Sequence, residues 1–209
     1  MENSTNLYQK LHKDSDKFGA RKNAGGLTDN MESAIKALSK QNVKSILDYG
    51  TGKGNFVQSL RKTLGSQYVI DGYDPAVKEW SKKATGKYDI VTCIDVLEHL
   101  EYDTIDKILC EIRDSTKLFS FLLIDLQPAV QYLANGRNAH TLLAPHDWWQ
   151  AKISRYFPYN ISFPIYHQGG YIQKQIVIGS FLPTSMNPMM LFANKLDIFN
   201  VMMSNPRSK

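Results

Sequence analysis

The sequence predicts an α/β fold: a mostly parallel sheet, doubly wound with helices on both faces, that ends in an antiparallel β-hairpin. Two observations predict it. Between residues 43 and 126, apolar runs of strand length alternate with amphipathic segments of helix length, which is typical of parallel sheets with right-handed crossovers. Beyond residue 160, two strand-like runs flank Gly169 and Gly170, which is the pattern of a hairpin.

Each element follows from its local pattern. Buried strands are expected at residues 43–49, 68–74, 88–95 and 117–126, and the hairpin strands at 161–168 and 171–182. Helices are expected at residues 55–65, 76–84, 102–116 and 146–157. Gly65 is the expected stop of the first helix and Asp103 the expected cap of the third. The third helix carries its apolar side chains on one face: Ile105, Ile108, Leu109 and Ile112.

The chain divides into three predicted parts. They are an N-terminal helical segment (1–42), a core (43–182) and a Met-rich C-terminal extension (183–209). In the first part, Leu7, Tyr8 and Leu11 share a helical face. In the last part, an amphipathic helix is expected at 188–203, packed on the body of the protein.

Composition favours a cytoplasmic globular protein. At 209 residues and 43% hydrophobic content, the chain suffices for one domain with a real core. No apolar run reaches the roughly 18 residues of a membrane span, and no secretory signal is expected at the N-terminus. Cys93 and Cys110 stand in apolar settings and are expected in the core, without a disulfide. The net charge of +5 is spread along the chain, which supports a nucleic-acid partner only weakly.

Three stretches of the sequence carry the candidate chemistry. In "ILDYGTGKGNF", Asp48 precedes Gly50, Gly52 and Gly54 at the end of the first predicted strand. Glycine at alternate positions indicates a tight turn or a close approach to the backbone. Asp74, in "DGYDP", ends the second strand about 20 residues after the last glycine, where a βαβ unit presents an acid to ribose hydroxyls. The third stretch is "YDIVTCIDVLEHL".

These three stretches resemble the motifs of class I S-adenosylmethionine-dependent methyltransferases. The resemblance covers about residues 43–182 and implies a Rossmann-like fold that uses S-adenosylmethionine and releases S-adenosylhomocysteine. It implies that the glycine loop turns under the cofactor and that "LEH" opens the next helix near the reacting methyl group. The cofactor-binding residues that it implies are Asp48, Tyr49, Gly50, Thr51, Gly52, Gly54, Asp74, Pro75, Asp95, Val96 and Leu97. Little room remains between Asp74 and Tyr88 for the family's third strand, which is therefore expected to be short or missing, and no adenine-binding residue is assigned.

A nicotinamide-dependent dehydrogenase is the competing interpretation, because it also needs an acid after the second strand. The G-x-G-x-G spacing differs from the dehydrogenase pattern, and Asp48 would repel a pyrophosphate but suits the amino group of S-adenosylmethionine. The terminal hairpin also favours the methyltransferase.

The loop "LANGRNAHTLLAPHDWW" (133–149) follows the fourth buried strand, at the ligand-binding edge. It is similar to a segment of small methyltransferases of phage and environmental origin. His140 and His99 are the candidate catalytic residues, expected to approach one pocket. Candidate acceptor contacts in this loop are Arg137, Asn138 and Trp148. Tyr8 and His12, with Lys22 as a further candidate, are added because in the resembling family a leading segment closes over the cofactor. In the alternative interpretation "NGR" is a turn, His146 and Asp147 cap the next helix, and both tryptophans are core. The histidines of this loop could also bind a metal ion, but no metal site is expected.

The expected reaction is in-line methyl transfer to an acceptor, with a small molecule favoured. RNA or protein acceptors, or a cofactor-binding scaffold that no longer catalyses, are the alternatives. DNA amino-methyltransferases and cytosine C5 enzymes are disfavoured, because "IDVLEHL" stands where the former carry a Pro-Pro motif and no Pro-Cys nucleophile occurs.

Overall fold

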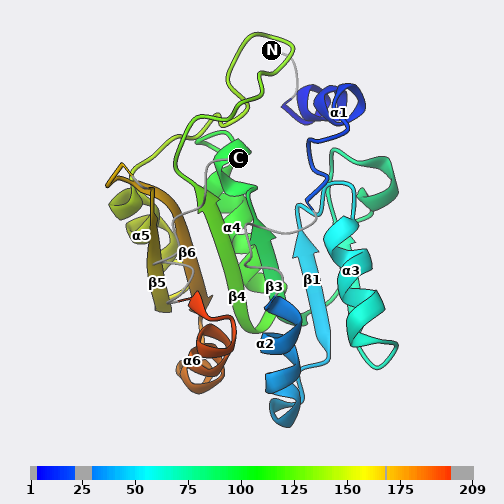
Figure 1. The fold of residues 1–209 in the computed structure, drawn as a ribbon, viewed down its shortest axis with the longest axis vertical. Coiled ribbons are helices and arrows are strands. Elements are labelled where there is room, and N and C mark those ends of the chain that lie inside the picture. Colours follow the sequence, from blue (N-terminus) through cyan, green and yellow to red (C-terminus); the bar gives the residue numbers. More distant parts are fainter. Residues whose placement is uncertain (1–3, 22–29, 168, 199–209) are drawn as a thin grey trace.

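The computed structural model describes residues 4–21, 30–167 and 169–198, and places a six-stranded sheet at the centre of the molecule (Figure 1). The strand order is β2-β1-β3-β4-β6-β5. The strands are β1 (Ser45–Tyr49), β2 (Val69–Tyr73), β3 (Tyr88–Ile94), β4 (Thr116–Asp125), β5 (Tyr159–Tyr166) and β6 (Ile172–Ser180). The first four strands run parallel, while β6 pairs antiparallel with both β4 and β5. The predicted α/β class, with its terminal hairpin, is confirmed.

The short connection between β2 and β3 carries no further strand. Residues 74–87, all of them described, contain one 3-10 turn, Lys78–Trp80. The helix expected at 76–84 is therefore wrong. The side chain of Trp80 instead lies against Gly54 and Gly72.

Helices cover both faces of the sheet. They are α2 (Met31–Ala37), α3 (Asn55–Leu64), α4 (Ile105–Asp114), α5 (His146–Ser154) and α6 (Met186–Lys195), while a further helix, α1 (Ser4–Asp14), lies apart from these faces. Side chains of α2, α3 and α6 share one apolar cluster with strand residues such as Phe121, and those of α4 and α5 share another with neighbours such as Leu122. Because alternate strand residues face opposite clusters, the strands read as nearly continuous apolar runs.

Helix ends confirm one expectation and correct another. Gly65 ends α3 with a φ of 79°, in the left-handed region that favours glycine. The N-cap of α4 is Thr104 rather than Asp103, and its side chain makes no capping hydrogen bond. Cys93 is fully buried, but Cys110 on α4 is only half-buried, so the core placement of Cys110 is wrong.

The C-terminal extension packs on the body, as expected. α6 begins at Met186, and the residues of the expected helix beyond 198 lie outside the described part of the chain. Phe192 of α6 is fully buried, with its ring 5.0 Å from that of Phe119 and 6.0 Å from that of Phe121. Among the described helices, none combines the length and apolar character that crossing a membrane requires.

α1 lies at the opposite end of the molecule from α6, above the carboxyl end of β1 (Figure 1). It does not pack on the sheet. Leu7 is buried against Leu133 and Ala139 of the loop that follows β4. The N-terminal helix therefore covers the carboxyl-end edge of the sheet, where parallel sheets bind ligands.

Candidate functional site

Two acids stand at the carboxyl ends of neighbouring strands. Asp48 of β1 is fully buried and accepts hydrogen bonds from Thr92 Oγ1 at 2.8 Å and Arg21 Nη2 at 2.7 Å. Asp74 follows β2 and accepts from the backbone N–H groups of Gly52 and Ala76, both at 2.9 Å. The carboxylate of Asp74 is thereby fixed against the glycine loop that Asp48 precedes.

The backbone angles and the close packing of the glycine loop require glycine at three positions. Gly50, Gly52 and Gly54 have φ angles of 77°, 57° and 76°, a region that other residues rarely adopt. A Cβ on any of them would lie within 3.0 Å of another part of the protein. The atoms met are the side chains of Val96 and Trp80 and the backbone of Gly19. The resemblance to methyltransferases implies a close approach of the cofactor here, but the chain's own atoms already require glycine at these positions.

The segment that ends at residue 21 lies on this glycine loop. We call residues 15–21 the N-terminal strap. The carbonyl of Gly19 accepts from Lys53 N–H at 2.9 Å, and the carbonyl of Ser15 accepts from Lys53 Nζ, also at 2.9 Å. Arg21 reaches from the strap to Asp48 and to the carbonyl of Ile94. Lys22, a candidate acceptor contact, lies outside the described residues.

Buried polar atoms without a protein partner gather around the loop. Among the described residues they include His12 Nδ1, Arg21 Nε and Thr51 Oγ1. Burial lowers the pKa of His12, so its imidazole is neutral near pH 7. Unpaired buried polar groups are costly, and a polar ligand would offset that cost. An amino acid and a ribose carry the donors and acceptors that these atoms lack, so the site fits S-adenosylmethionine.

The other cofactor candidates contribute in different ways. The side chain of Tyr49 points away from the loop and donates to Glu111 Oε2 at 2.9 Å beneath α4, leaving only its backbone at the site. Pro75 is exposed in the turn after β2, and Leu97 is core. Asp95 adopts a φ of 51°, which directs its carboxylate to Lys174 Nζ at 2.9 Å.

A second polar cluster follows β3. "LEH" forms only a 3-10 turn (Leu97–His99), so it does not open the next helix as expected; α4 begins at Ile105. The rings of His99 and His140 are 4.7 Å apart, and the expected meeting of the two histidines is observed. Glu98, His99 and His140 each offer one ligand atom, and these three atoms lie within 4.8 Å of one another.

Burial controls the charges of this cluster. Burial, together with the neighbouring His140, lowers the pKa of His99 to about 4. Burial also raises the pKa of Glu98 well above its usual value, and the Asp95 charge acts in the same direction. Burial alone would lower the pKa of Lys174, but Asp95 and Asp125 hold it above its usual range. Lys174 lies 3.3 Å from Asp125 and bridges the two acids.

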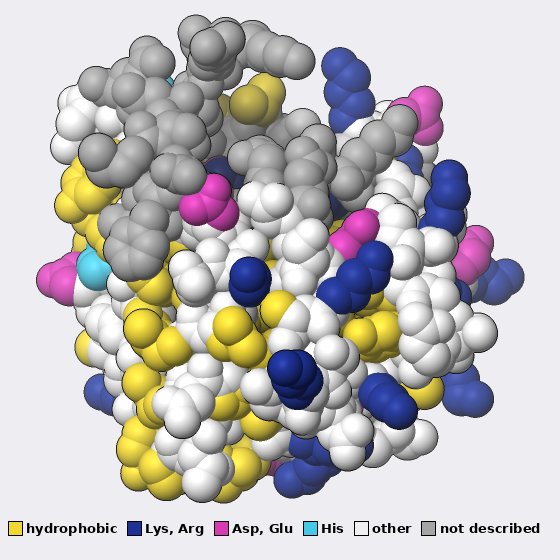
Figure 2. Space-filling model, turned by 60° about the horizontal axis from the view of Figure 1, so that its bottom comes forward, with side chains coloured by type: hydrophobic (Ala, Val, Ile, Leu, Met, Phe, Trp, Pro, Cys, Tyr) yellow, Lys and Arg dark blue, Asp and Glu magenta, His cyan; other side chains and the backbone are white. Residues whose placement is uncertain are grey.

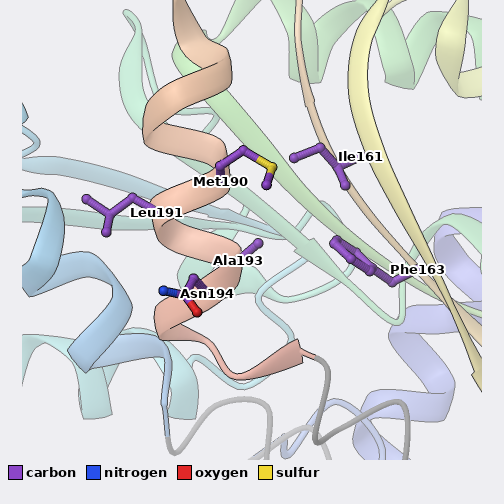
Figure 3. Close-up of a pocket in the computed structure, with 6 residues that line it drawn as sticks. All are labelled: Ile161, Phe163, Met190, Leu191, Ala193 and Asn194. Atoms are coloured by element: carbon purple, nitrogen blue, oxygen red, sulfur yellow. The ribbon is translucent and has the colours of Figure 1, made fainter.

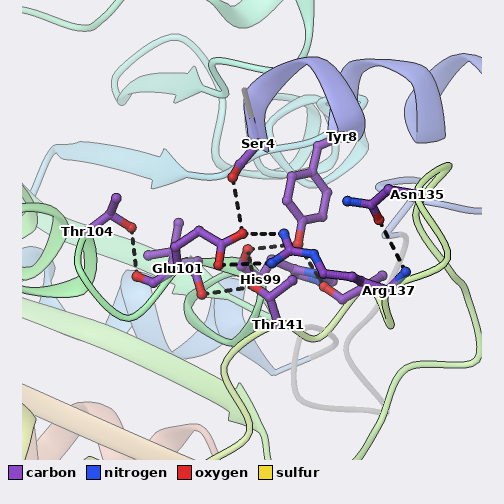
Figure 4. A network of polar contacts seen from close by, with 10 residues as sticks. Ser4, Tyr8, His99, Glu101, Thr104, Asn135, Arg137 and Thr141 are labelled. Atoms are coloured by element: carbon purple, nitrogen blue, oxygen red, sulfur yellow. Dashed lines mark hydrogen bonds and ion pairs between the residues drawn. The ribbon is translucent and has the colours of Figure 1, made fainter. Parts of the chain in front are cut away.

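The remaining candidates hold the loop in place (Figure 4). The Tyr8 hydroxyl lies 2.7 Å from the carbonyl of His99 and 2.8 Å from that of Ala139, and burial raises the pKa of Tyr8 to about 12. Arg137 is exposed and pairs with Glu101. Asn138 uses its amide on Ala129 and on the N–H of His140. These polar atoms are engaged by the protein.

The segment 133–149 agrees only in part with each of its two interpretations, as a set of acceptor contacts or as a turn followed by helix caps and core tryptophans. Trp149 is fully buried, whereas Trp148 is half-buried and packs against Tyr102, with Lys152 Nζ above its ring. The helix α5 starts at His146 after Pro145, and neither His146 nor Asp147 caps it. Trp148 therefore lies on the outer face of α5 rather than with the two histidines.

Two cavities differ in their relation to these groups. One, of about 620 Å³, is lined by Leu126, Gln127, Leu143, Ala144, Pro145, His146, Asp147 and Ile172. Neither His99 nor His140 lines it, but the lining residue Gln127 accepts a hydrogen bond from His140 Nδ1 through its carbonyl. The other, of about 490 Å³, is an apolar groove between β5 and α6, lined by Ile161, Phe163, Met190, Leu191, Ala193 and Asn194 (Figure 3). It is remote from the acids at the strand ends.

Sequence reasoning missed Arg21 and Lys174 at this edge. Each stands far from the motifs along the chain, as one lysine or arginine among 25, and only the fold brings them to Asp48 and Asp95. Glu98 was readable within "LEH", but nothing in the sequence showed that its carboxyl would be fully buried.

Comparison with known proteins agrees with this geometry. A family model described as a methyltransferase domain matches residues 21–153. An O-methyltransferase family protein from Burkholderia thailandensis is similar, with a TM-score of 0.53 at 13% identity over 73% of this chain and 54% of that one. The chain thus spans about half the length of the Burkholderia protein. A search of curated proteins gives no match.

Two further solved structures share the fold. DhpI, solved as its complex with SAH, has a TM-score of 0.50 at 10% identity, over 85% of this chain and 97% of that one. The mitomycin 7-O-methyltransferase MmcR has a TM-score of 0.50 at 14% identity, over 82% and 59%. The family match spans more than half of the chain, and the chain therefore belongs to the methyltransferase-domain family, the S-adenosylmethionine-dependent methyltransferases.

Proposed function

We propose that the protein transfers a methyl group from S-adenosylmethionine to a small-molecule acceptor bound beside the loop that follows β4. The observation that carries the proposal is the cavity of about 620 Å³ next to His140. Its volume falls within the roughly 300–1,000 Å³ of small-ligand sites. Most of its lining side chains are apolar, and His146 and Asp147 add polar groups that could orient an acceptor.

The chain's own residues divide the work of cofactor binding. In this proposal, Asp74 accepts hydrogen bonds from ribose hydroxyls and Asp48 holds an amino group. Arg21, whose Nε has no partner among the described residues while its Nη2 pairs with Asp48, donates to a carboxylate. The cofactor supplies a methyl group already activated by its sulfonium. What remains for the protein is alignment and exclusion of water. The N-terminal strap and α1 cover the edge and serve that purpose, whereas Tyr8, Arg137 and Asn138 position the loop.

The distribution of charge gives less support to a nucleic-acid acceptor. On the face shown in Figure 2, Lys and Arg side chains are spread singly among apolar and uncharged ones, without forming a stripe. Several basic side chains are also held by acids of the same chain, such as Arg137 by Glu101 and Lys174 by Asp95. Backbone phosphates are recognised by clustered positive charge.

Calorimetry with S-adenosylhomocysteine tests the cofactor assignment, with NAD as the competing ligand. We expect binding of the sulfur nucleotide and none of NAD. Asp74→Asn should weaken binding by about 1.5–3 kcal/mol, a factor of roughly 10 to 150 in Kd, because charge-assisted hydrogen bonds are lost.

Asp71→Asn is the matched control, since Asp71 lies on β2, three residues before Asp74, and pairs with Arg61. It should bind as the wild type does. Binding of NAD without binding of S-adenosylhomocysteine would contradict the proposed function. An unchanged Kd for S-adenosylhomocysteine in folded Asp74→Asn would contradict it as well. Turnover of S-adenosylmethionine that persists in the filtrate of a metabolite extract, after a small-pore filter has retained the macromolecules, identifies the acceptor as small.

A further inference from the structure

Glu98, His99 and His140 form a cluster that the methyl-transfer chemistry does not require. Glu98 accepts from the N–H of Asp125 through Oε1 at 2.9 Å, while its Oε2 is buried and has no partner. The residue is fully buried. A buried carboxylate oxygen without a hydrogen bond or counter-ion is strongly unfavourable. Its position beside two imidazoles makes Glu98 a candidate cation ligand.

Both histidines use Nδ1 in a contact with a backbone carbonyl. His99 Nδ1 lies 2.7 Å from the carbonyl of Ala139, and His140 Nδ1 is bonded to the carbonyl of Gln127. A carbonyl only accepts, so each Nδ1 carries the hydrogen and each neutral ring keeps its lone pair on Nε2. Metal-binding histidines in proteins are oriented by such a hydrogen bond from the other ring nitrogen to a carbonyl or carboxylate.

Glu98 is an acid of this region without a basic partner. Lys174 pairs with Asp95 and Asp125, and among the ion pairs of the described residues none involves Glu98. A cation bound between Glu98 and the two imidazoles would give this carboxyl the partner that the lysine does not supply.

We propose that Glu98, His99 and His140 bind one divalent transition-metal ion of the zinc, cobalt or manganese class. Two imidazoles and one carboxylate are a ligand set that such ions favour, and that calcium and magnesium do not. Ligands at 2.0–2.1 Å on one tetrahedral ion lie about 3.3 Å apart. The three ligand atoms are within 4.8 Å, so side-chain shifts of an ångström or two close the site.

Three protein ligands leave coordination positions open, as in catalytic metal sites. Because His140 adjoins the cavity of about 620 Å³, an oxygen of the acceptor is the donor suited to these positions. This part of the inference rests on the proposed function and narrows the acceptor to a molecule with a hydroxyl or carboxylate near the methylated atom.

Titration of the metal-stripped protein with Co²⁺ tests the site, read by visible absorption and by calorimetry. We expect one saturable site per chain. His140→Ala and Glu98→Gln should each lower the affinity by more than about tenfold, since loss even of outer-shell partners costs 10- to 100-fold. Glu98→Gln keeps the acceptor for the Asp125 N–H, so its fold is retained.

His167→Ala is the matched control, because His167 stacks on Tyr171 in the hairpin and belongs to no part of the cluster. It should bind Co²⁺ as the wild type does. The proposal is overturned if the wild type shows no saturable Co²⁺ site, or if Glu98→Gln and His140→Ala bind Co²⁺ as tightly as His167→Ala.

Calorimetry with S-adenosylhomocysteine on the same proteins separates the two proposals. Nucleotide binding without Co²⁺ binding removes the metal site and leaves the methyltransferase. Co²⁺ binding without nucleotide binding does the reverse. For the metal site to act on the acceptor, His140→Ala must lower single-turnover methyl transfer while nucleotide affinity stays unchanged; full turnover in that variant would confine the ion to a structural role.

Discussion

At the scale of single residues, the pair of Arg21 and Asp48 ties the N-terminal strap to the sheet. The two side chains are 2.7 Å apart, with 12% of the Arg21 side chain and none of the Asp48 side chain exposed. Arg21 also lies over the ring of Phe56, at 5.6 Å. Such a pair is costly to desolvate, and removing one partner leaves the other charge buried.

Arg21→Met should therefore lower the free energy of unfolding by about 3 kcal/mol. Asp48→Asn should be destabilising as well. The double variant should lose less than the sum of the single losses, because it no longer buries an unpaired charge. Urea denaturation of the four proteins measures the coupling. Strictly additive losses would mean that the ion pair contributes nothing beyond packing.

At the scale of elements, α6 closes one face of the sheet. Its Phe192 is fully buried between β4 and α2, whereas Met190, on the same helix, is 55% exposed. Large aromatic side chains dominate the energy of such a contact. The packing of this helix therefore depends on few positions.

Phe192→Ala should cost about 3–5 kcal/mol, because it removes the ring and leaves a cavity. Met190→Ala should change stability by less than about 0.5 kcal/mol. For a chain of this size each kcal/mol corresponds to about 2–4 °C in Tm. Equal melting temperatures for the two variants would show that α6 is not part of the cooperative core.

At the scale of the whole molecule, Asp89 connects strands at the amino ends of the sheet. Its Oδ2 accepts from the N–H groups of Lys44 and Ser45, at 2.8 and 2.9 Å, and from Ser45 Oγ at 2.8 Å. Burial raises the pKa of Asp89, but these hydrogen bonds and the Lys117 charge outweigh it, so the net pKa lies below the usual value. The ionised form therefore stabilises the fold.

This stabilisation should be fully present above the unfolded pKa of about 3.9 and be lost as the pH falls through the lower folded value. Asp89→Asn should accordingly be less stable than the wild type at pH 7, by about 1–3 kcal/mol. The difference should shrink below about pH 4. Denaturation at pH 7, 5 and 3 checks it, and a difference that persists unchanged at pH 3 would exclude ionisation as its source.

The sequence by itself determined the sheet, the hairpin and the two acids at the strand ends. Periodicity reports which face of an element is buried, and the spacing from Gly54 to Asp74 follows from one βαβ unit. These features depend on neighbours along the chain. The element boundaries were less certain, since β1 begins at Ser45 rather than at residue 43 and residues 76–84 form no helix.

Only the tertiary structure decided which side chains meet at the edge. His99 and His140 are 41 residues apart along the chain, and Lys174 and Asp95 are 79 apart. His140 reaches His99 because the loop after β4 folds back under α1, and Lys174 reaches Asp95 because β6 pairs antiparallel with β4. The burial of Glu98, whose Oε2 has no hydrogen-bond partner among the described residues, is likewise a property of the packed molecule, and no local pattern encodes it.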